Sequence, residues 1–402
     1  MRIGIDARFY GTLGKGLGRY TQKLIENLEK LDDTNEYFVF LRKENFEEYR
    51  PKNKNFQKVL ADCGWYTISE QLNMPKILNK HNLDLVHFPH FNVPLFYKKP
   101  FIITIHDLIL LHFPTVKSTS LNPLWYKIKY LAYKLIIKNA ILKAKNIITV
   151  SNFTKNDILR HYNVTENKIT VTYEAADINV TQNRLKNDSN ILEKYGIIKP
   201  YILYVGNAYP HKNLEALVLG FGKVAMSFRA SDSESRNLIE RNKKIRSFDY
   251  VSRRHFAQDD TSLVLVGKED YFYKRIKGLV IEKNIKNIIF TDFVPDDELD
   301  TVYRNSLFYI FPSLYEGFGL PPIEAMARNV PVLSSDIPCL REILGESACY
   351  FNASSKENIA RAITDFSENK ELREKLSQRG NEWVKIYSWE KMARETLTIY
   401  KN

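Results

Sequence analysis

The chain has 402 residues, 44% of them hydrophobic, which is enough apolar material to build the packed cores of two α/β domains. Lys and Arg number 59 against 47 acidic residues, and the net charge of +12 favours an anionic partner such as nucleic acid, a membrane surface or a phosphorylated substrate. No nucleic-acid-binding signature, disulfide framework, signal peptide or long apolar run is present, so we expect a cytoplasmic protein that binds no nucleic acid and has no transmembrane helix.

The first half of the chain alternates short apolar runs with helical patterns. Such alternation predicts a parallel, doubly wound sheet, which is the Rossmann-like arrangement, over residues 1–180. Strands are expected at residues 3–6, 37–41, 85–88, 101–105, 147–150 and 169–173, with helices at 19–31 and 151–161 among them. The polar residues 181–199 predict a linker or a linker helix.

The same pattern restarts after the linker and predicts a second Rossmann-like domain over residues 200–386. Strands are expected at 201–205, 262–266, 287–291, 307–311 and 330–334, and helices at 213–225, 274–283, 296–304 and 323–328. Residues 227–261 are charged and separate a helix from a strand that a short turn usually joins, so they predict a polar insertion. Residues 387–402 predict a last helix with Ser388 as its N-cap.

A glycine-rich segment that includes Gly16 and Gly18 follows the first expected strand. Glycine lets the backbone approach a ligand closely. The segment is not a Walker A loop, because Leu17 stands where lysine is required. It is not a dinucleotide fingerprint either, because Arg19 stands where glycine or alanine is required. It predicts either a ligand-contacting loop or a plain turn before a helix.

His106 ends the apolar strand at 101–105, at the edge where parallel sheets bind ligands. Taken alone, it is equally well explained as a satisfied core histidine. Other histidines lie nearby in sequence, but their spacing fits no zinc motif, so we expect no metal site. These are His81, His87, His90 and His112.

The segment 124–145 contains no acidic residue and has a helical pattern. It predicts either a basic amphipathic helix that docks on anionic lipid or a domain helix with a solvated lysine face. Its lysines near one face are Lys127, Lys134, Lys138 and Lys145, and its aromatic residues suited to an interface are Trp125, Tyr126, Tyr130 and Tyr133.

A further basic residue, Lys212, follows the expected strand at 201–205. Lys212 opens a helix, where a cation and backbone amides together can neutralise a diphosphate. The alternative is a solvated lysine at a helix start.

The segment 316–324 is the most informative one in the chain. Two prolines at 321–322 can start a helix, because the first helical residues need no N–H donor. The preceding loop therefore offers amides at a helix N-terminus, which suits a phosphate, and it consists of Gly317, Phe318, Gly319 and Leu320. Glu316 at the strand end and Glu324 in the first helical turn can accept hydrogen bonds from sugar hydroxyls. A plain glycine-proline turn would not explain both carboxylates.

Together these segments resemble the retaining glycosyltransferases of family 4, which have the GT-B fold. The resemblance spans nearly the whole chain and rests on the two glutamates of 316–324, the glycine-rich loop, Thr-Ile-His-Asp-Leu at 104–108 and Pro-His-Lys-Asn-Leu at 210–214. It implies an α/β protein with two Rossmann-like domains and an interdomain cleft. The first domain would take the acceptor and the second the nucleotide-sugar donor, and residues 387–402 would cross back to the first domain.

The resemblance also implies roles in the second domain. The diphosphate would leave toward Lys212 and the amides of 318–320, Glu316 would hold the donor sugar and stabilise its positive charge, and Glu324 would bind the ribose hydroxyls. Asn207 stands where the family often carries an arginine, so other groups would have to neutralise that part of the diphosphate charge.

In the first domain, the resemblance implies that His106 hydrogen-bonds a hydroxyl of the donor sugar. The loop with Gly16 and Gly18 would contact the donor phosphate and help shape the acceptor site.

We therefore expect a metal-independent enzyme without a cofactor, which moves a hexose from a nucleoside-diphosphate sugar to a hydroxyl of a saccharide or lipid-linked acceptor with retention of configuration. The motifs at 3–8, 104–108 and 210–214 are most similar to mannosyltransferases of surface-polysaccharide assembly, so GDP-mannose is the first donor to test. If 124–145 docks on lipid, the protein would be peripheral at the inner membrane face. The alternatives are a non-catalytic GT-B scaffold that binds a glycan or partner enzyme, and a nucleotide-sugar epimerase.

Overall fold

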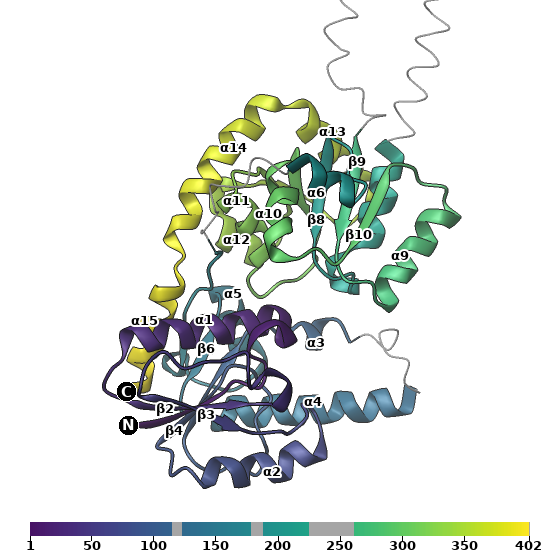
Figure 1. Cartoon of the computed structure of the whole chain (residues 1–402). Coiled ribbons are helices and arrows are strands. Elements are labelled where there is room, and N and C mark those ends of the chain that lie inside the picture. Colours follow the sequence, from purple (N-terminus) through teal and green to yellow (C-terminus); the bar gives the residue numbers. More distant parts are fainter. Residues whose placement is uncertain (115–122, 178–187, 225–260, 402) are drawn as a thin grey trace, which may run out of the picture. The chain divides into compact units, whose positions relative to one another are not determined.

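The computed structural model describes residues 1–114, 123–177, 188–224 and 261–401 (Figure 1). The chain divides into two compact units, Met1–Ala175 with Tyr387–Asn402, and Ala176–Ile386. The second unit therefore begins a few residues before the expected boundary at residue 180, and the last helix belongs to the first unit. The expected insertion at 227–261 lies, except for its last residue, outside the described residues.

The first unit is built on a parallel sheet whose strand order, within the described residues, is β3-β2-β1-β4-β5-β6-β7. Its strands are apolar nearly throughout, as strands covered on both faces must be. The strand order reverses between β1 and β4, which is where such sheets bind ligands. The strands are β1 (Arg2–Asp6), β2 (Glu36–Leu41), β3 (Phe56–Leu60), β4 (Leu85–Phe88), β5 (Phe101–Ile105), β6 (Ile147–Thr149) and β7 (Ile169–Val171).

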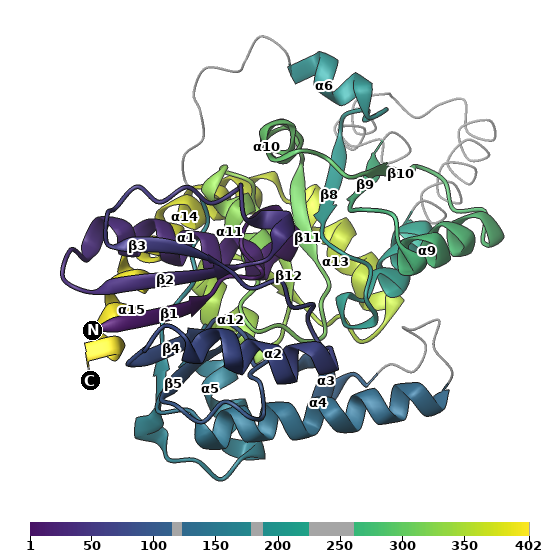
Figure 2. The same cartoon turned by 60° about the horizontal axis from the view of Figure 1, so that its bottom comes forward.

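Helices cover both faces of this sheet (Figures 1 and 2). On one face, α1 (Lys15–Leu31) packs against α15 (Trp389–Lys401), and Tyr400 of α15 hydrogen-bonds the buried His87 of β4 at 2.7 Å. On the other face, α2 (Ile68–Asn79), α4 (Pro123–Lys143) and α5 (Asn152–His161) bury apolar side chains in one core cluster with the strands. The short α3 (Ile109–His112) follows β5.

The second unit repeats the plan with a parallel sheet of order β10-β9-β8-β11-β12-β13 in its described part. The order reverses between β8 and β11. The strands are β8 (Tyr201–Val205), β9 (Ser262–Val266), β10 (Ile288–Asp292), β11 (Phe308–Phe311), β12 (Val332–Ser335) and β13 (Cys349–Phe351). The helices are α6 (Asp188–Lys194), residues 214–224, α9 (Tyr271–Glu282), α10 (Asp296–Arg304), α11 (Leu320–Ala327), α12 (Pro338–Leu344), α13 (Lys356–Glu368) and α14 (Lys370–Trp383).

The structure agrees with the expected linker helix and departs from the predicted strands. The described part of 181–199 contains α6, which packs on α10 through hydrogen bonds such as that from Lys194 Nζ to Glu298 Oε1 at 2.8 Å. The sequence did not predict β3 and β13, because these edge strands are short and carry partly exposed side chains, so they lack the continuous apolar run of a central strand.

Candidate active site

The predicted site residues of the second unit follow the two strands at which the sheet order reverses. Asn207 and Lys212 come after β8, and Glu316 comes after β11. The carboxyl ends of neighbouring parallel strands open at the same edge, so the fold brings these residues to the ligand-binding edge of the sheet.

Lys212 and Glu316 form an ion pair at this edge. The Nζ atom of Lys212 lies 2.6 Å from Oε1 of Glu316, with side-chain exposures of only 13% and 8%. The ammonium group also lies 5.2 Å from the ring centroid of Phe311, the last residue of β11. The site thus holds a partly desolvated cation and anion in contact.

Hydrogen bonds join the loop after β8, which carries Lys212, to the loop after β11. Asn213 adopts a left-handed conformation with φ of 60°, and its side-chain amide donates to the carbonyl groups of Pro312 and Ala353. The amide of Leu314 donates to the carbonyl of His211 at 2.7 Å. Burial and the neighbouring Lys212 lower the pKa of His211 to about 4, so its imidazole is neutral at neutral pH. Lys212 is therefore placed by the backbone and not by a flexible loop.

The loop before α11 has the backbone conformation of a helix N-terminus. Gly319 is the N-cap of α11 with φ of 97°, and a Cβ there would lie 2.8 Å from Cδ2 of Leu340, so glycine is required. Leu320 is the first helical residue, followed by the two prolines. Gly317 and Phe318 are buried, and the carbonyl of Phe318 lies 3.8 Å from Sγ of Cys339.

Glu324 is the fifth residue of α11, so it lies just past the first turn in which the sequence placed it. Its Oε2 accepts a hydrogen bond from the hydroxyl of Tyr303 at 3.3 Å. Arg328, one turn later, donates to the carbonyl of Glu324 and lies over the Tyr303 ring. The carboxylate is thus partly exposed on a fixed helix.

Asn207 uses its side chain within its own turn. Its Oδ1 accepts from the amide of Tyr209 at 3.2 Å, and its carbonyl accepts from the hydroxyl of Tyr204 at 2.7 Å. Asn207 therefore shapes the loop after β8 and brings no positive charge to it.

In the first unit, the glycine-rich segment forms a 3₁₀ turn over Gly11–Gly14 and leads into α1. A Cβ at Gly18 would lie 2.1 Å from the carbonyl oxygen of Gly11, so packing alone explains this glycine. Gly16 is exposed, and a Cβ there would meet nothing within 4 Å. Of the two predicted residues, Gly16 is the one that a ligand can approach.

His106 lies at the end of β5 with both ring nitrogens engaged. Nδ1 lies 3.0 Å from Oε1 of Glu174, and Nε2 lies 3.0 Å from the carbonyl oxygen of Pro89. Both partners accept hydrogen bonds, so this geometry favours the doubly protonated imidazolium. Burial lowers the pKa of His106, but the hydrogen bonds and the charge of Glu174 outweigh it and the net shift is upward. No sequence motif marks Glu174, which comes just after β7.

A group of potential metal ligands lies elsewhere in the first unit. The ligand atoms of His112, Asp157 and His161 lie within 4.8 Å of one another, and Nε2 of His112 lies 2.8 Å from Oδ2 of Asp157. Sequence spacing missed this group, because two members lie on α5, far along the chain from His112. The His112 contact is also an ordinary imidazole–carboxylate hydrogen bond, so the group by itself assigns no metal.

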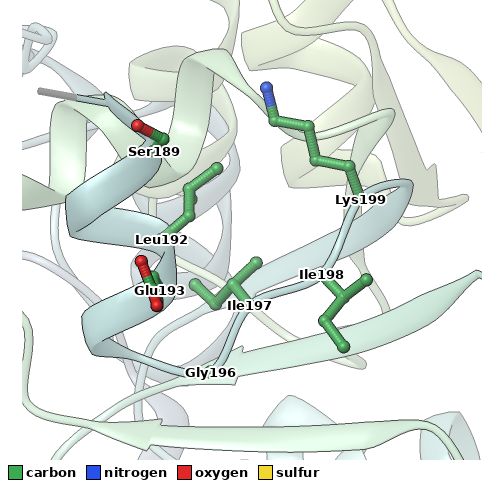
Figure 3. Close-up of a pocket in the computed structure, with 7 residues that line it drawn as sticks. All are labelled: Ser189, Leu192, Glu193, Gly196, Ile197, Ile198 and Lys199. Carbon is green, nitrogen blue, oxygen red and sulfur yellow. The ribbon is translucent and has the colours of Figure 1, made fainter. Parts of the chain in front are cut away.

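A surface hollow opens between α6 and the segment that leads into β8 (Figure 3). It contains none of the predicted site residues and has mainly apolar walls. Its lining consists of Ser189, Leu192, Glu193, Gly196, Ile197, Ile198 and Lys199.

Two family models match the chain. Residues 14–180 match the model described as Glycosyltransferase Family 4, and residues 241–383 match the model described as Glycosyl transferases group 1. Each match falls largely on one of the two units, so together they account for the greater part of the chain.

Known proteins agree with these matches. The chain is 25% identical over 396 residues to O-antigen chain mannosyltransferase RfbU of Salmonella typhimurium, covering 95% of this chain and 94% of that protein. Among solved structures, sucrose-phosphate synthase from Thermosynechococcus elongatus matches with a TM-score of 0.71 at 18% identity, covering 100% and 98% of the two chains. HepE from Anabaena, in complex with UDP and glucose, matches with a TM-score of 0.70 at 13% identity, covering 100% and 99%. Both structures confirm the predicted two-domain fold.

Proposed function

Because the chain belongs to the family 4 glycosyltransferases with the GT-B fold, we propose that it transfers mannose from GDP-mannose to a saccharide or lipid-linked saccharide. The likeness to an O-antigen mannosyltransferase over nearly the whole chain supports this sugar. The observation that carries the proposal is the Lys212–Glu316 pair, held at the edge where the sheet order reverses and beside the N-terminus of α11.

The leaving diphosphate would bind the amides of Gly319 and Leu320 together with Lys212. Charge grows on the phosphate as the glycosidic bond breaks, and fixed dipoles with a nearby cation stabilise that charge. As Lys212 turns toward the phosphate, Glu316 would be released to hold the donor sugar and its developing positive charge. Glu324, on the rigid α11, would accept hydrogen bonds from the ribose hydroxyls.

In the first unit, Gly16 would contact the donor phosphate. His106 would bind a sugar hydroxyl by exchanging its hydrogen bond to the Pro89 carbonyl, since Glu174 holds the other nitrogen. The positive charge of Lys212 would neutralise the leaving diphosphate, so we propose a metal-independent reaction. Retention would follow from same-face attack, in which the departing phosphate accepts the proton of the acceptor hydroxyl.

The first experiment is donor binding and slow donor hydrolysis across a nucleotide-sugar panel that includes GDP-mannose, with EDTA present. We expect one donor to bind tightly and to release free sugar slowly, and Glu324→Ala to weaken that binding without changing the fold. Failure of every donor to bind would refute the proposal and favour a glycan-binding scaffold. Loss of activity in EDTA would refute the metal-independent part alone.

We further propose that α4 docks the first unit on an anionic membrane. None of the described helices is long and apolar enough to cross a bilayer. One face of α4, however, leaves apolar side chains 43–60% exposed, namely Ile128, Leu131, Leu135 and Leu142. Exposed lysines flank this stripe, namely Lys127, Lys129, Lys134, Lys138 and Lys143.

The opposite face of α4 packs in the core through Ile137, Ala140 and Ile141. The predicted interfacial role of Tyr133 is wrong, because its ring packs 5.0 Å from that of Phe91 against the core. The side chains of Trp125 and Tyr126 lie outside the described residues. The exposed leucines and isoleucine, and not Tyr133, are thus the groups that would enter a lipid interface.

Vesicle sedimentation tests this docking. We expect binding to phosphatidylcholine vesicles only when they contain phosphatidylglycerol, and a loss of about tenfold or more in a Lys134→Glu, Lys138→Glu variant, at about 1 kcal/mol per lysine. A Lys274→Glu, Lys283→Glu variant, at exposed positions on and directly after α9 in the second unit, makes the same change in net charge and is the matched control. Equal binding of both variants would argue against α4.

A further inference from the structure

Aromatic rings gather at the ligand edge of the first unit, at the point where its strand order reverses between β1 and β4. Phe9 follows β1, Trp65 and Tyr66 follow β3, and His90 and Phe91 follow β4. The rings of Phe9 and Trp65 stack at 4.3 Å, those of His90 and Phe91 lie 3.9 Å apart, and those of Tyr66 and His90 lie 6.2 Å apart. We call these five residues the aromatic platform.

Tyr66 stands at the exposed side of the aromatic platform. Its side chain is 59% exposed, although its backbone is held in the left-handed region with φ of 59°. That conformation costs a bulky residue about 1–2 kcal/mol, so surrounding contacts must enforce it. An exposed ring kept in a costly conformation is a feature of binding sites more than of packing.

A buried charged network supplies those contacts. The amide of Tyr66 donates to Oε2 of Glu70 at 2.9 Å. Oε1 of Glu70 lies 2.6 Å from the guanidinium of Arg8 and accepts from Asn92 at 2.6 Å. Arg8 is fully buried and also forms a bidentate pair with Asp6 at 2.7 Å. The position of Tyr66 is therefore fixed from β1, α2 and the loop after β4.

The aromatic platform also has unused hydrogen-bonding capacity. Within the described residues, Nε1 of Trp65 and Nδ1 of His90 are buried and have no hydrogen-bond partner. Burial lowers the pKa of His90 to about 3, so its imidazole is neutral and Nδ1 can donate or accept according to its tautomer. Buried polar atoms without partners are rare and costly, and they point to a polar ligand or water that completes them.

We propose that the aromatic platform binds a pyranose ring of the saccharide acceptor, with Tyr66 as its stacking surface. The C–H groups on one face of a pyranose carry slight positive charge and suit the negative face of an aromatic ring. The hydroxyls of the pyranose can supply the hydrogen-bond partners that Nε1 of Trp65 and Nδ1 of His90 lack. Apolar walls with a few placed polar groups are the usual composition of small-molecule sites. This inference rests on the proposed transfer to a saccharide.

Saturation-transfer NMR with the methyl glycosides of mannose, glucose, galactose and N-acetylglucosamine tests the aromatic platform directly. We expect at least one of them to bind at millimolar concentration with saturation confined to one face of its ring. Tyr66→Ala should weaken this binding at least tenfold, whereas Tyr66→Phe should change it less than threefold. Trp65→Phe, which keeps the stacked ring but removes the indole N–H, should weaken binding severalfold. Tyr271→Ala, an exposed tyrosine on α9, is the matched control.

Donor hydrolysis without acceptor, measured on the same variants, separates the two proposals. Unchanged hydrolysis in Tyr66→Ala with lost glycoside binding supports an acceptor site. Glycoside binding that depends on Tyr66 in a chain that neither binds nor hydrolyses any donor keeps the sugar site and refutes the transferase. Parent and Tyr66→Ala proteins that bind within twofold of each other, or a parent that binds none of the glycosides, would overturn the aromatic platform while leaving hydrolysis to judge the transferase.

Discussion

The two units share one plan but present different chemistry at the same place in the fold. In each, the strand order reverses beside the first strand of the sheet, and the candidate groups follow the strands on either side. The second unit offers an ion pair and a helix N-terminus, which suit a phosphate and a sugar carrying charge. The first unit offers stacked rings over a buried charged network, which suit a neutral ring. Under both proposals, the fold would determine where ligands bind and the loops would determine which ligands bind there.

The sharpest test of this comparison is to break the buried network of the first unit. Arg8→Met leaves the carboxylates of Asp6 and Glu70 buried without their cation, so we expect the free energy of unfolding to fall by about 3–5 kcal/mol. Arg394→Met removes an exposed pair with Glu390 on α15 and should cost about 0–1 kcal/mol. Urea denaturation measures both. Equal losses would mean that the Arg8 network does not stabilise the first unit.

The ion pair of the second unit should matter for turnover. Lys212→Met removes the cation next to the proposed diphosphate site, and we expect kcat for donor hydrolysis to fall by about 10²–10³-fold. Lys223→Met removes an exposed pair with Glu357 in the same unit and should leave kcat unchanged. If Lys212→Met raised only the donor KM, the lysine would bind the ground state and not the leaving group.

The same comparison explains what the sequence could predict. The loop from Glu316 to Glu324 is contiguous, so its glycines and prolines predicted the helix start that the structure shows, whereas the phosphate site stays a prediction. Hydrophobic runs likewise located the central strands β4, β5, β8 and β9 at their observed bounds, because strands buried on both faces carry unbroken apolar sequence. The edge strands β3 and β13 lack that run and were missed.

The aromatic platform and Glu174 could not be predicted in this way. Their members come from loops after different strands, and no single segment contains more than two of them. Only the strand order, which the sequence does not state, brings Phe9 next to Trp65 and His106 next to Glu174. Asn207 shows the converse, because the sequence noted a missing charge there and the structure gives that residue a local role in the turn.

The smallest expected effect concerns the pH dependence of the first unit. Glu174 raises the pKa of His106 in the folded chain above its ordinary value of about 6.5. A raised pKa means that the folded state binds the proton more tightly than the unfolded state. The pair therefore adds stability that is fully present below pH 6.5 and is lost as the pH rises through the folded pKa.

Glu174→Gln keeps the hydrogen bond but removes the charge, so the variant should lose less stability than the parent between pH 6 and pH 9. Glu36→Gln, exposed on the same sheet, is the control and should follow the parent. NMR titration of the His106 ring should show a lower pKa in Glu174→Gln. An unchanged pKa would mean that the Pro89 carbonyl, and not Glu174, keeps His106 protonated.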